Sequence, residues 1–322
     1  MNKILDAKPE KKEEKEELSL RPKKLSEFIG QNKLKKRLDV FLQAAKGRDE
    51  CLDHILFYGP PGLGKTTLAM LLAGEMGTKV RMTSGPALAK AGDLAAILTG
   101  LKKGEFLFID EIHRLNKIIE EMLYSAMEDY CLDIVLGKGP SAKTVRLNLQ
   151  HFTIVGATTR IGLIGGPMRD RFGIVSQLDF YEDSDLTEIV SRTADLLGSQ
   201  ISRQAAEVIA KRARGTPRIA NRLLKRVRDW AQVNSDGKID TKEAVEAMEM
   251  MGVDDQGLSD ADRKYLKVIA KSYNGGPVGV ENLAASLSED IGTIEDVYEP
   301  FLMKKGLVKR TRQGRVLVKK FK

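Results

Sequence analysis

The chain has 322 residues, of which 42% are hydrophobic and 30% charged, so we expect most of it to fold into two or three domains. Lys and Arg outnumber Asp and Glu by 53 to 45, and the resulting net charge of +8 favours a polyanionic partner. The longest stretch without a charged residue, Leu147 to Thr159, has 13 residues, too few for a membrane span. Two cysteines cannot form a disulfide framework and no signal peptide is evident, so a cytoplasmic protein without membrane contact is expected.

The elements expected along the chain fall into four regions. Residues 1–19 alternate Lys with Glu and indicate a disordered charged arm. Through 20–181 the strand-like runs HILFYG, KVRMTS, FLFID and FTIVGATT alternate with helical patterns, which predicts an α/β domain, a parallel sheet with helices on both faces. Only helical patterns occupy 182–254, a small helical domain. Residues 255–322 contain three helical patterns and a basic hairpin around Gln313-Gly314, typical of a winged helix.

A phosphate-binding pattern, G-x-x-x-x-G-K-[ST], is matched by GPPGLGKT at residues 59–66. The match follows an apolar strand pattern and opens a helical one, as a phosphate loop requires. Loop amides and the helix dipole can bind phosphate oxygens, so we expect Lys65 to reach the β and γ phosphates and Thr66 to bind Mg²⁺. The alternative is an ordinary glycine turn. The candidate loop residues are Gly59, Gly62, Gly64, Lys65, Thr66 and Thr67.

Two further apolar runs end in polar residues. FLFI is followed by Asp110 and Glu111, and ionised groups at the tip of a buried strand need a cation or a chemical role. We expect Asp110 to hold Mg²⁺ through water and Glu111 to polarise the attacking water as a general base. The alternative is a surface strand end. FTIVGAT ends at Thr158, which either points at the γ-phosphate or is a structural cap.

Arginines suggest two more nucleotide contacts. MRDRFG, residues 168–173, places two arginines beside one carboxylate, so one arginine can pair locally while the other stabilises transition-state charge, on a neighbouring subunit's nucleotide. Thr216 and Pro217 suit the N-cap and first position of a helix, which leaves Arg218 in the first turn. A positive charge is poorly matched to the dipole there, and contact with an anion would explain it.

Apolar and polar residues alternate through 132–136 and 144–149, on either side of GKGPSAK. This pattern predicts a β-hairpin between the helix after Glu111 and the strand that ends at Thr158. The hairpin either extends the sheet or carries a partner contact.

The ordered set GPPGLGKTT, LFIDEIHRLNK, GKGPSAK, GATTR, RDRFGI, RGTPRIANRLLKRVRD and GGPVG resembles the RuvB family of AAA+ motors, from about Leu20 to Arg315. The resemblance implies an ATP-driven homohexamer that drives branch migration of Holliday junctions in recombination and repair. It implies ATP and Mg²⁺ as cofactors, duplex DNA as the substrate, and RuvA and RuvC as partners. It also implies an AAA+ large domain, an AAA+ small helical (lid) domain and a winged-helix head.

The resemblance assigns roles to the candidate residues. Walker A contains Lys65 and Thr66, Walker B contains Asp110 and Glu111, and sensor 1, the trans-acting arginine finger and sensor 2 are Thr158, Arg171 and Arg218. Further nucleotide positions are Leu20, Arg21, Tyr181 and the segment Glu128, Asp129 and Tyr130. DNA-contacting positions are Arg310 and Arg315, and candidate RuvA contacts on the hairpin are Leu132, Ile134, Val145 and Leu147.

The chain departs from the family in the wing, where Arg310 to Arg315 read RTRQGR and the family typically reads RTPRGR. A clamp-loader-like ATPase is the main alternative, but it typically carries Ser-Arg-Cys where this chain has Arg169-Asp170-Arg171. A protein unfoldase would present an aromatic pore loop, and residues 84–100 contain no aromatic residue. A DNA-binding protein that uses ATP only as a switch, and a winged helix that binds protein, are further alternatives.

Overall fold

The computed structural model describes residues 19–136 and 143–318, and side chains within 134–143 are not described. The predicted arm, apart from its last residue, and the hairpin loop at 137–142 lie outside the described residues. No helix among the residues described is both long and apolar enough to cross a membrane.

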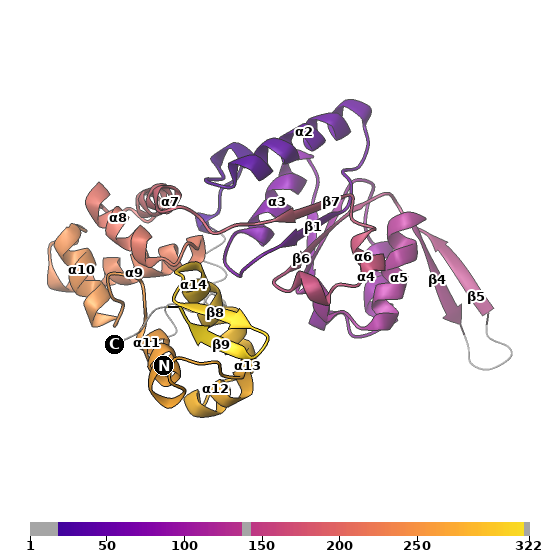
Figure 1. The fold of residues 1–322 in the computed structure, drawn as a ribbon. Coiled ribbons are helices and arrows are strands. Elements are labelled where there is room, and N and C mark those ends of the chain that lie inside the picture. The colour runs from indigo at the N-terminus through magenta and orange to yellow at the C-terminus, as the bar shows by residue number, and fades with distance from the viewer. Residues whose placement is uncertain (1–18, 137–142, 319–322) are drawn as a thin grey trace. The chain divides into compact units, whose positions relative to one another are not determined.

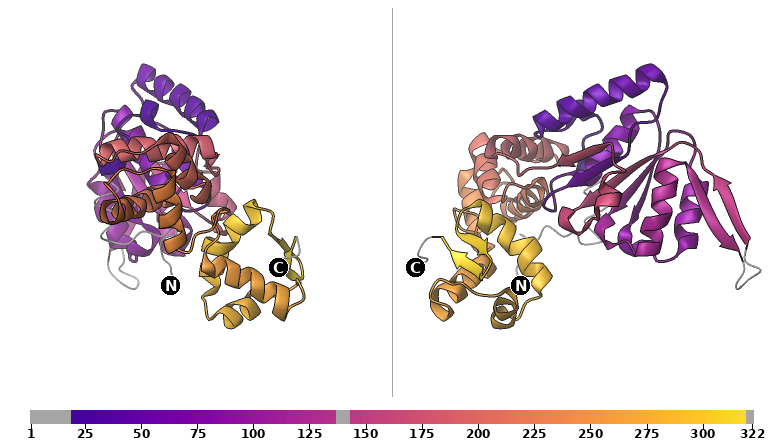
Figure 2. Two further views of the ribbon diagram at one scale, coloured as in Figure 1. Left: turned by 90° about the vertical axis from the view of Figure 1, so that its left-hand side faces the viewer. Right: turned by 45° about the vertical axis from the view of Figure 1, so that its right-hand side comes forward.

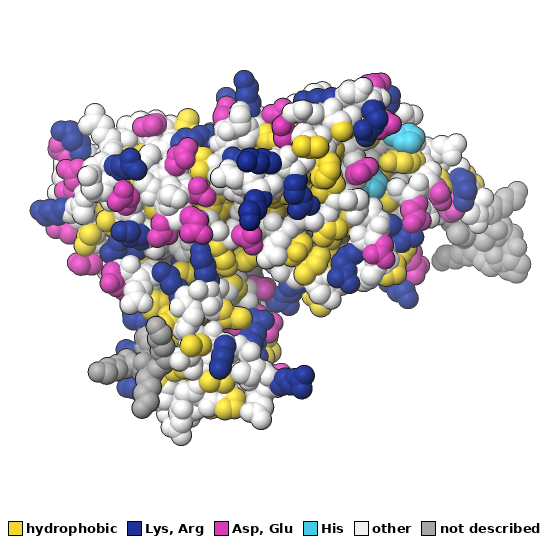
Figure 3. Space-filling view, turned by 45° about the horizontal axis from the view of Figure 1, so that its top comes forward, with side chains coloured by type: hydrophobic (Ala, Val, Ile, Leu, Met, Phe, Trp, Pro, Cys, Tyr) yellow, Lys and Arg dark blue, Asp and Glu magenta, His cyan; other side chains and the backbone are white. Residues whose placement is uncertain are grey.

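The chain forms two compact units. The sheet unit contains residues 21–59 and 64–179, and the described part of the helical unit contains 19–20, 60–63 and 180–318. Both predicted C-terminal domains, the lid and the head, lie within the helical unit. On the face drawn in Figure 3, Lys and Arg side chains are interspersed with Asp and Glu, so the net positive charge is not gathered there into one patch.

The sheet unit contains a five-stranded parallel sheet with the order β2-β3-β6-β1-β7 (Figure 1). Its strands are β1 (Ile55–Tyr58), β2 (Val80–Ser84), β3 (Phe106–Asp110), β6 (Thr153–Thr158) and β7 (Ile174–Gln177). β1, β3 and β6 are central, and their apolar residues are buried on both faces, as expected for parallel strands covered by helices. The four predicted strands are confirmed.

The strand β7 was not predicted from the sequence. It has four residues, IVSQ, with only alternate side chains buried, because it lies at the edge of the sheet beside β1. So short an alternating run resembles a loop in sequence.

Helices cover the sheet on both sides. The helices are α2 (Asn32–Arg48), α3 (Lys65–Glu75), α4 (Ala91–Thr99), α5 (Lys117–Glu128) and α6 (Gly166–Arg169), with short helical turns η2 (Leu25–Glu27), η3 (Gly85–Ala87), η4 (Ile112–Arg114) and η6 (Ile161–Leu163). Leu94 and Leu98 of α4 and Leu123 of α5 pack on Leu107 and Ile109 of β3 in one apolar core. Figure 1 shows α2 and α3 on the other side of the sheet.

The predicted hairpin is formed by β4 (Cys131–Leu136) and β5 (Lys143–Asn148), which pair antiparallel. These strands make a sheet of their own, so the alternative that they extend the central sheet is wrong. In Figures 1 and 2 the hairpin projects beyond the end of α5.

The lid part of the helical unit has four helices, α7 (Asp183–Leu196), α8 (Arg203–Arg212), α9 (Pro217–Asn234) and α10 (Thr241–Met250). Local caps explain where two of them begin. The Ser202 hydroxyl accepts a hydrogen bond of 3.2 Å from the Ala205 amide at the start of α8, and Asp240 and Glu243 form a capping box at the start of α10.

The head follows as α11 (Asp260–Ser272), α12 (Val280–Leu287), α13 (Ile291–Thr293), the π-helical turn η7 (Ile294–Tyr298), α14 (Glu299–Lys304) and the wing strands β8 (Val308–Thr311) and β9 (Gly314–Leu317). The winged-helix prediction is confirmed. The turn was placed one residue too late, since the chain turns at Arg312-Gln313 and Gly314 already pairs with Thr311. Gly314 (φ +131°) has to be glycine because a Cβ there would clash with the Val278 carbonyl oxygen.

A buried ion pair joins lid and head. The Arg214 guanidinium, from the turn between the lid helices α8 and α9, donates hydrogen bonds to Asp262 of α11, to the Ser259 hydroxyl (3.3 Å) and to the Gly257 carbonyl (3.2 Å). Arg214 and Asp262 are both buried. Asp262 also accepts the Ser259 amide at 2.7 Å, which completes a capping box.

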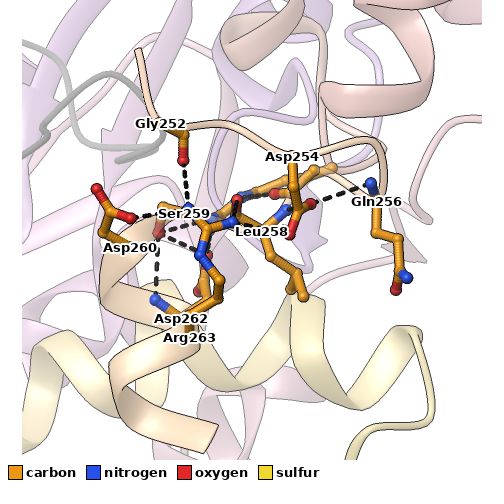
Figure 4. A network of polar contacts seen from close by, with 10 residues as sticks. Gly252, Asp254, Gln256, Leu258, Ser259, Asp260, Asp262 and Arg263 are labelled. Carbon is orange, nitrogen blue, oxygen red and sulfur yellow. Dashed lines mark hydrogen bonds and ion pairs between the residues drawn. The ribbon is translucent and has the colours of Figure 1, made fainter. Parts of the chain in front are cut away.

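The linker between lid and head is held by a second set of contacts, drawn in Figure 4. Asp254 accepts the amides of Gln256 (3.0 Å) and Leu258 (2.8 Å), and Arg263 donates to Asp254 and to the Gly252 carbonyl (2.8 and 2.9 Å). The linker is therefore an ordered turn rather than a loose tether.

Removing Asp262 should destabilise the helical unit strongly. Asp262→Ala leaves the buried Arg214 charge unpaired, and we expect a loss of about 3 to 5 kcal/mol in the free energy of unfolding, measured by urea denaturation. The matched control is Asp260→Ala, because Asp260 also pairs with an arginine but its side chain is 77% exposed, so its loss should be under about 1 kcal/mol. Equal losses for the two variants would contradict the importance of the buried pair.

Candidate active site

The phosphate-loop motif lies between β1 and the N-terminus of α3. A Cβ at Gly59 (φ +138°) would lie 2.5 Å from the carbonyl oxygen of Leu178, so only glycine fits there. Gly64 (φ +97°) is the N-cap of α3, whose first turn has neither a side-chain cap nor an acidic residue. The amides of this turn and the positive end of the helix dipole therefore form a site for an anion such as phosphate.

The Lys65 side chain folds back over the loop. Its buried ammonium donates a hydrogen bond of 2.7 Å to the Gly59 carbonyl oxygen. An anion stabilises a buried ammonium group. Phosphate oxygens bound by the amides of this loop would lie within reach of the Lys65 ammonium. Thr66 and Thr67 follow in the first turn and are partly buried. The loop thus fits the phosphates of a nucleotide.

Oxygen ligands for Mg²⁺ are available in the sheet unit. Thr66 supplies a hydroxyl at the start of α3, and Asp110 supplies a carboxylate at the end of β3, on which α3 packs. Within the described ranges there is no cluster of three or more His, Cys, Asp or Glu side chains that could bind a metal by itself. In nucleotide sites Mg²⁺ takes one or two protein oxygens and completes its shell with phosphate and water. These residues fit a Mg²⁺ that is bound together with a nucleotide.

The two carboxylates after β3 differ in their surroundings. Asp110 Oδ1 accepts the Glu111 amide at 2.9 Å, which fixes the Asp110 side chain beside the strand end. Glu111 has a left-handed backbone (φ +46°), and its exposed carboxylate accepts a hydrogen bond of 3.0 Å from Arg114. The Asp110 carboxylate is therefore held at the end of β3, whereas the Glu111 carboxylate is exposed and paired with Arg114.

Thr158 ends β6 as a fully buried residue opposite Tyr58 of β1. Its hydroxyl accepts the Arg160 amide at 2.9 Å and shares a hydrogen bond of 2.9 Å with His113 Nδ1. The prediction from sequence did not include this contact with His113. The only signal in the sequence was the position of His113 in the turn directly after Asp110 and Glu111.

The predicted arginine finger, Arg171, is held within its own sheet unit. Its guanidinium donates to Glu128 (3.0 Å) and to the Pro167 carbonyl (2.6 Å), and it lies 4.2 Å from the centre of the Tyr124 ring. The sequence predicts that one arginine of this segment pairs locally with Asp170 and that the other remains free. The Arg171 partner is instead Glu128, at the far end of α5, which sequence spacing does not reveal.

The segment Glu128 to Tyr130 therefore lies beside the finger. Asp129 is exposed, while the Tyr130 ring packs on the ring of His151 with centroids 4.0 Å apart. Burial raises the pKa of the Tyr130 hydroxyl. This segment combines an exposed carboxylate pair with an anchored aromatic ring.

The helical unit carries several of the predicted nucleotide residues, among them Tyr181 and Arg218. Tyr181 is buried and its hydroxyl donates a hydrogen bond of 3.2 Å to the carbonyl oxygen of Leu63, in the phosphate loop. Thr216 is the N-cap of α9 and Pro217 its first residue, as predicted, although the Thr216 hydroxyl donates to the carbonyl of residue 213 rather than capping the helix. Arg218 lies in the first turn of α9 and is partly buried.

Leu20 and Arg21 lie at the start of the described chain. Leu20, in the helical unit, is buried, and its carbonyl accepts a hydrogen bond of 3.3 Å from Arg192. Arg21, in the sheet unit, donates to the sulfur of Met70 in α3 at 3.1 Å. Their nucleotide role stays a prediction.

The wing arginines share one buried carboxylate. Arg310 and Arg315 face each other across the β8–β9 hairpin, and both donate to the fully buried Glu299. Arg315 also donates to Glu295 at 2.9 Å, and the Tyr265 hydroxyl donates to Glu299 at 3.1 Å. The Arg310 side chain remains 42% exposed and the Arg315 side chain only 12%. Arg310 thus retains more surface for an external contact than Arg315.

The four predicted RuvA contacts differ in exposure. Leu132 is buried in the core of the sheet unit and Leu147 packs partly against that core, whereas Val145 is 38% exposed. Ile134 pairs with Val145 in the hairpin, and its side chain lies outside the described residues.

Comparisons with known proteins cover nearly the whole chain. Three family models match: the Holliday junction DNA helicase RuvB P-loop domain at residues 20–178, the RuvB AAA lid domain at 181–254 and the RuvB C-terminal winged helix domain at 255–321. A Clostridium kluyveri protein, the Holliday junction branch migration complex subunit RuvB, is 57% identical over 300 residues, which are 93% of this chain and 86% of the relative.

Solved structures of Thermotoga maritima RuvB superpose closely on this chain. One, described as a Holliday junction branch migration motor, has a TM-score of 0.86 and 52% identity, and the match covers 94% of this chain and 96% of that one. A structure of a variant of the same protein has a TM-score of 0.87 and 53% identity with the same coverage. On this evidence the chain, with its P-loop domain, helical lid and winged helix, belongs to the RuvB family of Holliday junction DNA helicases.

Proposed function

We propose that this chain is the motor subunit of a homohexameric ring that hydrolyses ATP and pulls duplex DNA, so that the branch point of a Holliday junction moves. One observation carries the proposal: a phosphate loop and two carboxylates lie at the ends of strands of the same parallel sheet. In the loop, Lys65 donates a hydrogen bond to the Gly59 carbonyl, and the carboxylates of Asp110 and Glu111 follow at the end of β3. The relatives named above, a branch migration complex subunit and a branch migration motor, support it.

In the proposed hydrolysis, the α3 N-terminus and Lys65 bind the β and γ phosphates, as their burial and orientation allow. Thr66 and Asp110 would hold Mg²⁺, which would supply positive charge to neutralise the phosphates. Glu111 orients the attacking water and takes its proton. Thr158, fixed by His113 and the Arg160 amide, contacts the γ-phosphate.

We further propose that Arg171 acts on the nucleotide of a neighbouring copy. The segment Glu128 to Tyr130 lies beside Arg171 through the Glu128 ion pair, so both belong to the surface offered to that neighbour. Arg218 and Tyr181 of the helical unit, with Leu20 and Arg21, contact the copy's own nucleotide in this scheme. A nucleotide held by two copies lets hydrolysis in one alter its grip on the next.

The partners follow from the family. We propose that the β4–β5 hairpin binds RuvA, with exposed Val145 and its pair Ile134 as the contact, while buried Leu132 and partly buried Leu147 support the hairpin. The winged-helix head binds duplex DNA through Arg310 and Arg315, and RuvC acts on the same junction. These assignments account for surfaces that ATP hydrolysis does not use.

The function is tested on a synthetic four-way junction. The purified protein with RuvA, ATP and Mg²⁺ should convert the junction into separated duplexes on a native gel. Lys65→Ala should abolish conversion because it weakens nucleotide binding. ATP consumption by the unchanged chain without any junction conversion would contradict the proposal.

Loss of the finger should separate binding from hydrolysis. Arg171→Ala should lower the rate of ATP hydrolysis by about a thousandfold or more, the order of magnitude for arginine fingers, while the affinity for a fluorescent ATP analogue changes little. Arg169→Ala, a neighbouring arginine, is the control and should leave turnover near normal. Normal turnover by Arg171→Ala would rule out the shared site.

The wing arginines should report on phosphate contacts. Arg310→Ala and Arg315→Ala should lower duplex affinity and flatten the dependence of log affinity on log salt concentration by about one unit per lost contact. Lys242→Ala, an exposed lysine of α10, is the control. If the slope is unchanged while thermal stability falls, the arginines serve only to hold Glu299, and the head would then be a candidate for binding protein.

A further inference from the structure

Glycine at position 85 lies directly against the backbone of Glu111. Gly85 begins the turn η3 immediately after β2, and Ser84 pairs with Asp110 of β3. A Cβ built on Gly85 would lie 2.5 Å from the Glu111 carbonyl oxygen and 3.3 Å from the Arg114 carbonyl carbon. Those atoms are backbone and cannot rotate away, so any side chain at position 85 has to displace the turn that carries Glu111.

The Glu111 turn is held in an unusual conformation. Its left-handed backbone is disfavoured for a residue with a Cβ and persists only where surrounding contacts maintain it. The Arg114 amide donates a hydrogen bond of 2.8 Å to the Glu111 carbonyl oxygen, the same atom that Gly85 faces. A side chain at position 85 would therefore press on the backbone turn that carries the Glu111 side chain.

Asn116 makes a second link between the same two segments. Its side-chain oxygen accepts the Ile119 amide at 3.0 Å and caps α5, while its side-chain nitrogen donates to the Ala89 carbonyl oxygen at 3.1 Å. Residues 85–89 are thus joined to residues 111–116 at both ends, and between them Leu88 is buried in the core.

We propose that residues 85–89 position Glu111 for catalysis. Gly85 allows the two backbone segments to approach closely at Glu111, and Asn116 holds the other end of the segment through its hydrogen bond to the Ala89 carbonyl. The inference rests on the proposed role of Glu111 as the base. It adds Gly85 and Asn116 as positioning residues, which act through the turn that carries Glu111. It also implies that a displacement of residues 85–89 changes the rate of hydrolysis without changing ATP affinity.

Two substitutions separate positioning from folding. Gly85→Ala adds the Cβ that meets the Glu111 carbonyl. Asn116→Asp keeps an oxygen that caps α5, and its negative charge interacts favourably with the helix dipole. The same substitution removes the hydrogen-bond donor to the Ala89 carbonyl and places a negative charge against that carbonyl oxygen. The control is Gly92→Ala, because a Cβ at Gly92 in α4 meets nothing within 4 Å.

The rate of ATP hydrolysis at saturation should fall by about tenfold or more for Gly85→Ala and by about threefold for Asn116→Asp, because small displacements of a reacting group are costly. The dissociation constant of a fluorescent ATP analogue should stay within about twofold for both variants, and the control should match the unchanged chain. In a Glu111→Gln background, Gly85→Ala should have no further effect on turnover.

The proposal fails if Asn116→Asp and a folded Gly85→Ala both turn over ATP normally, or if ATP affinity falls in parallel with the rate. If Gly85→Ala does not fold, Asn116→Asp alone decides between these outcomes. Failure of the proposed function looks different, since Glu111→Gln would then hydrolyse ATP as fast as the unchanged chain.

Discussion

Parallel hydrogen bonding among β1, β3 and β6 is the constraint on which the site depends. Because these strands run in the same direction, their carboxyl ends lie side by side at one end of the sheet. Gly59, Asp110 and Thr158 therefore lie at the same end of the sheet, and the Gly59 amide donates a hydrogen bond of 3.2 Å to the Thr158 carbonyl oxygen. The apolar residues of these three strands are buried on both faces, because helices cover the sheet on both sides.

The free-energy cost of breaking an arginine–carboxylate pair in this protein depends on how deeply the pair is buried. Arg214 and Asp262 are both buried, so breaking the pair leaves an uncompensated charge. Glu128, the partner of Arg171, is 56% exposed, and such a pair adds at most about 1 kcal/mol. Losing the Glu128 contact alone would therefore cost Arg171 little, because its hydrogen bond to the Pro167 carbonyl and its contact with the Tyr124 ring remain. The same kind of ion pair thus holds the lid to the head strongly but ties Arg171 to Glu128 only weakly.

The sequence was sufficient for the parts of the fold and site that short-range patterns encode. Lys65, Asp110 and Thr158 lie at the ends of the strands and helix that the apolar runs predicted. The partners of the arginines were not predictable, because Arg171 and Glu128 are 43 residues apart, and nothing local selects Glu299 for Arg315. The edge strand β7 and the one-residue shift of the wing turn depend on β1 and on the Val278 backbone, which are tertiary neighbours.

The central claim, that adjoining copies complete one another's hydrolysis sites, is tested most directly by mixing two inactive variants. Lys65→Ala protein cannot bind the phosphates but still offers Arg171, and Arg171→Ala protein binds ATP but offers no finger. If sites are shared, an equal mixture assembled on DNA should regain hydrolysis at about a quarter of its sites by random assortment, although each variant alone is inactive. If the mixture remains as inactive as its components, each copy works with its own arginine and the account of a shared site is wrong.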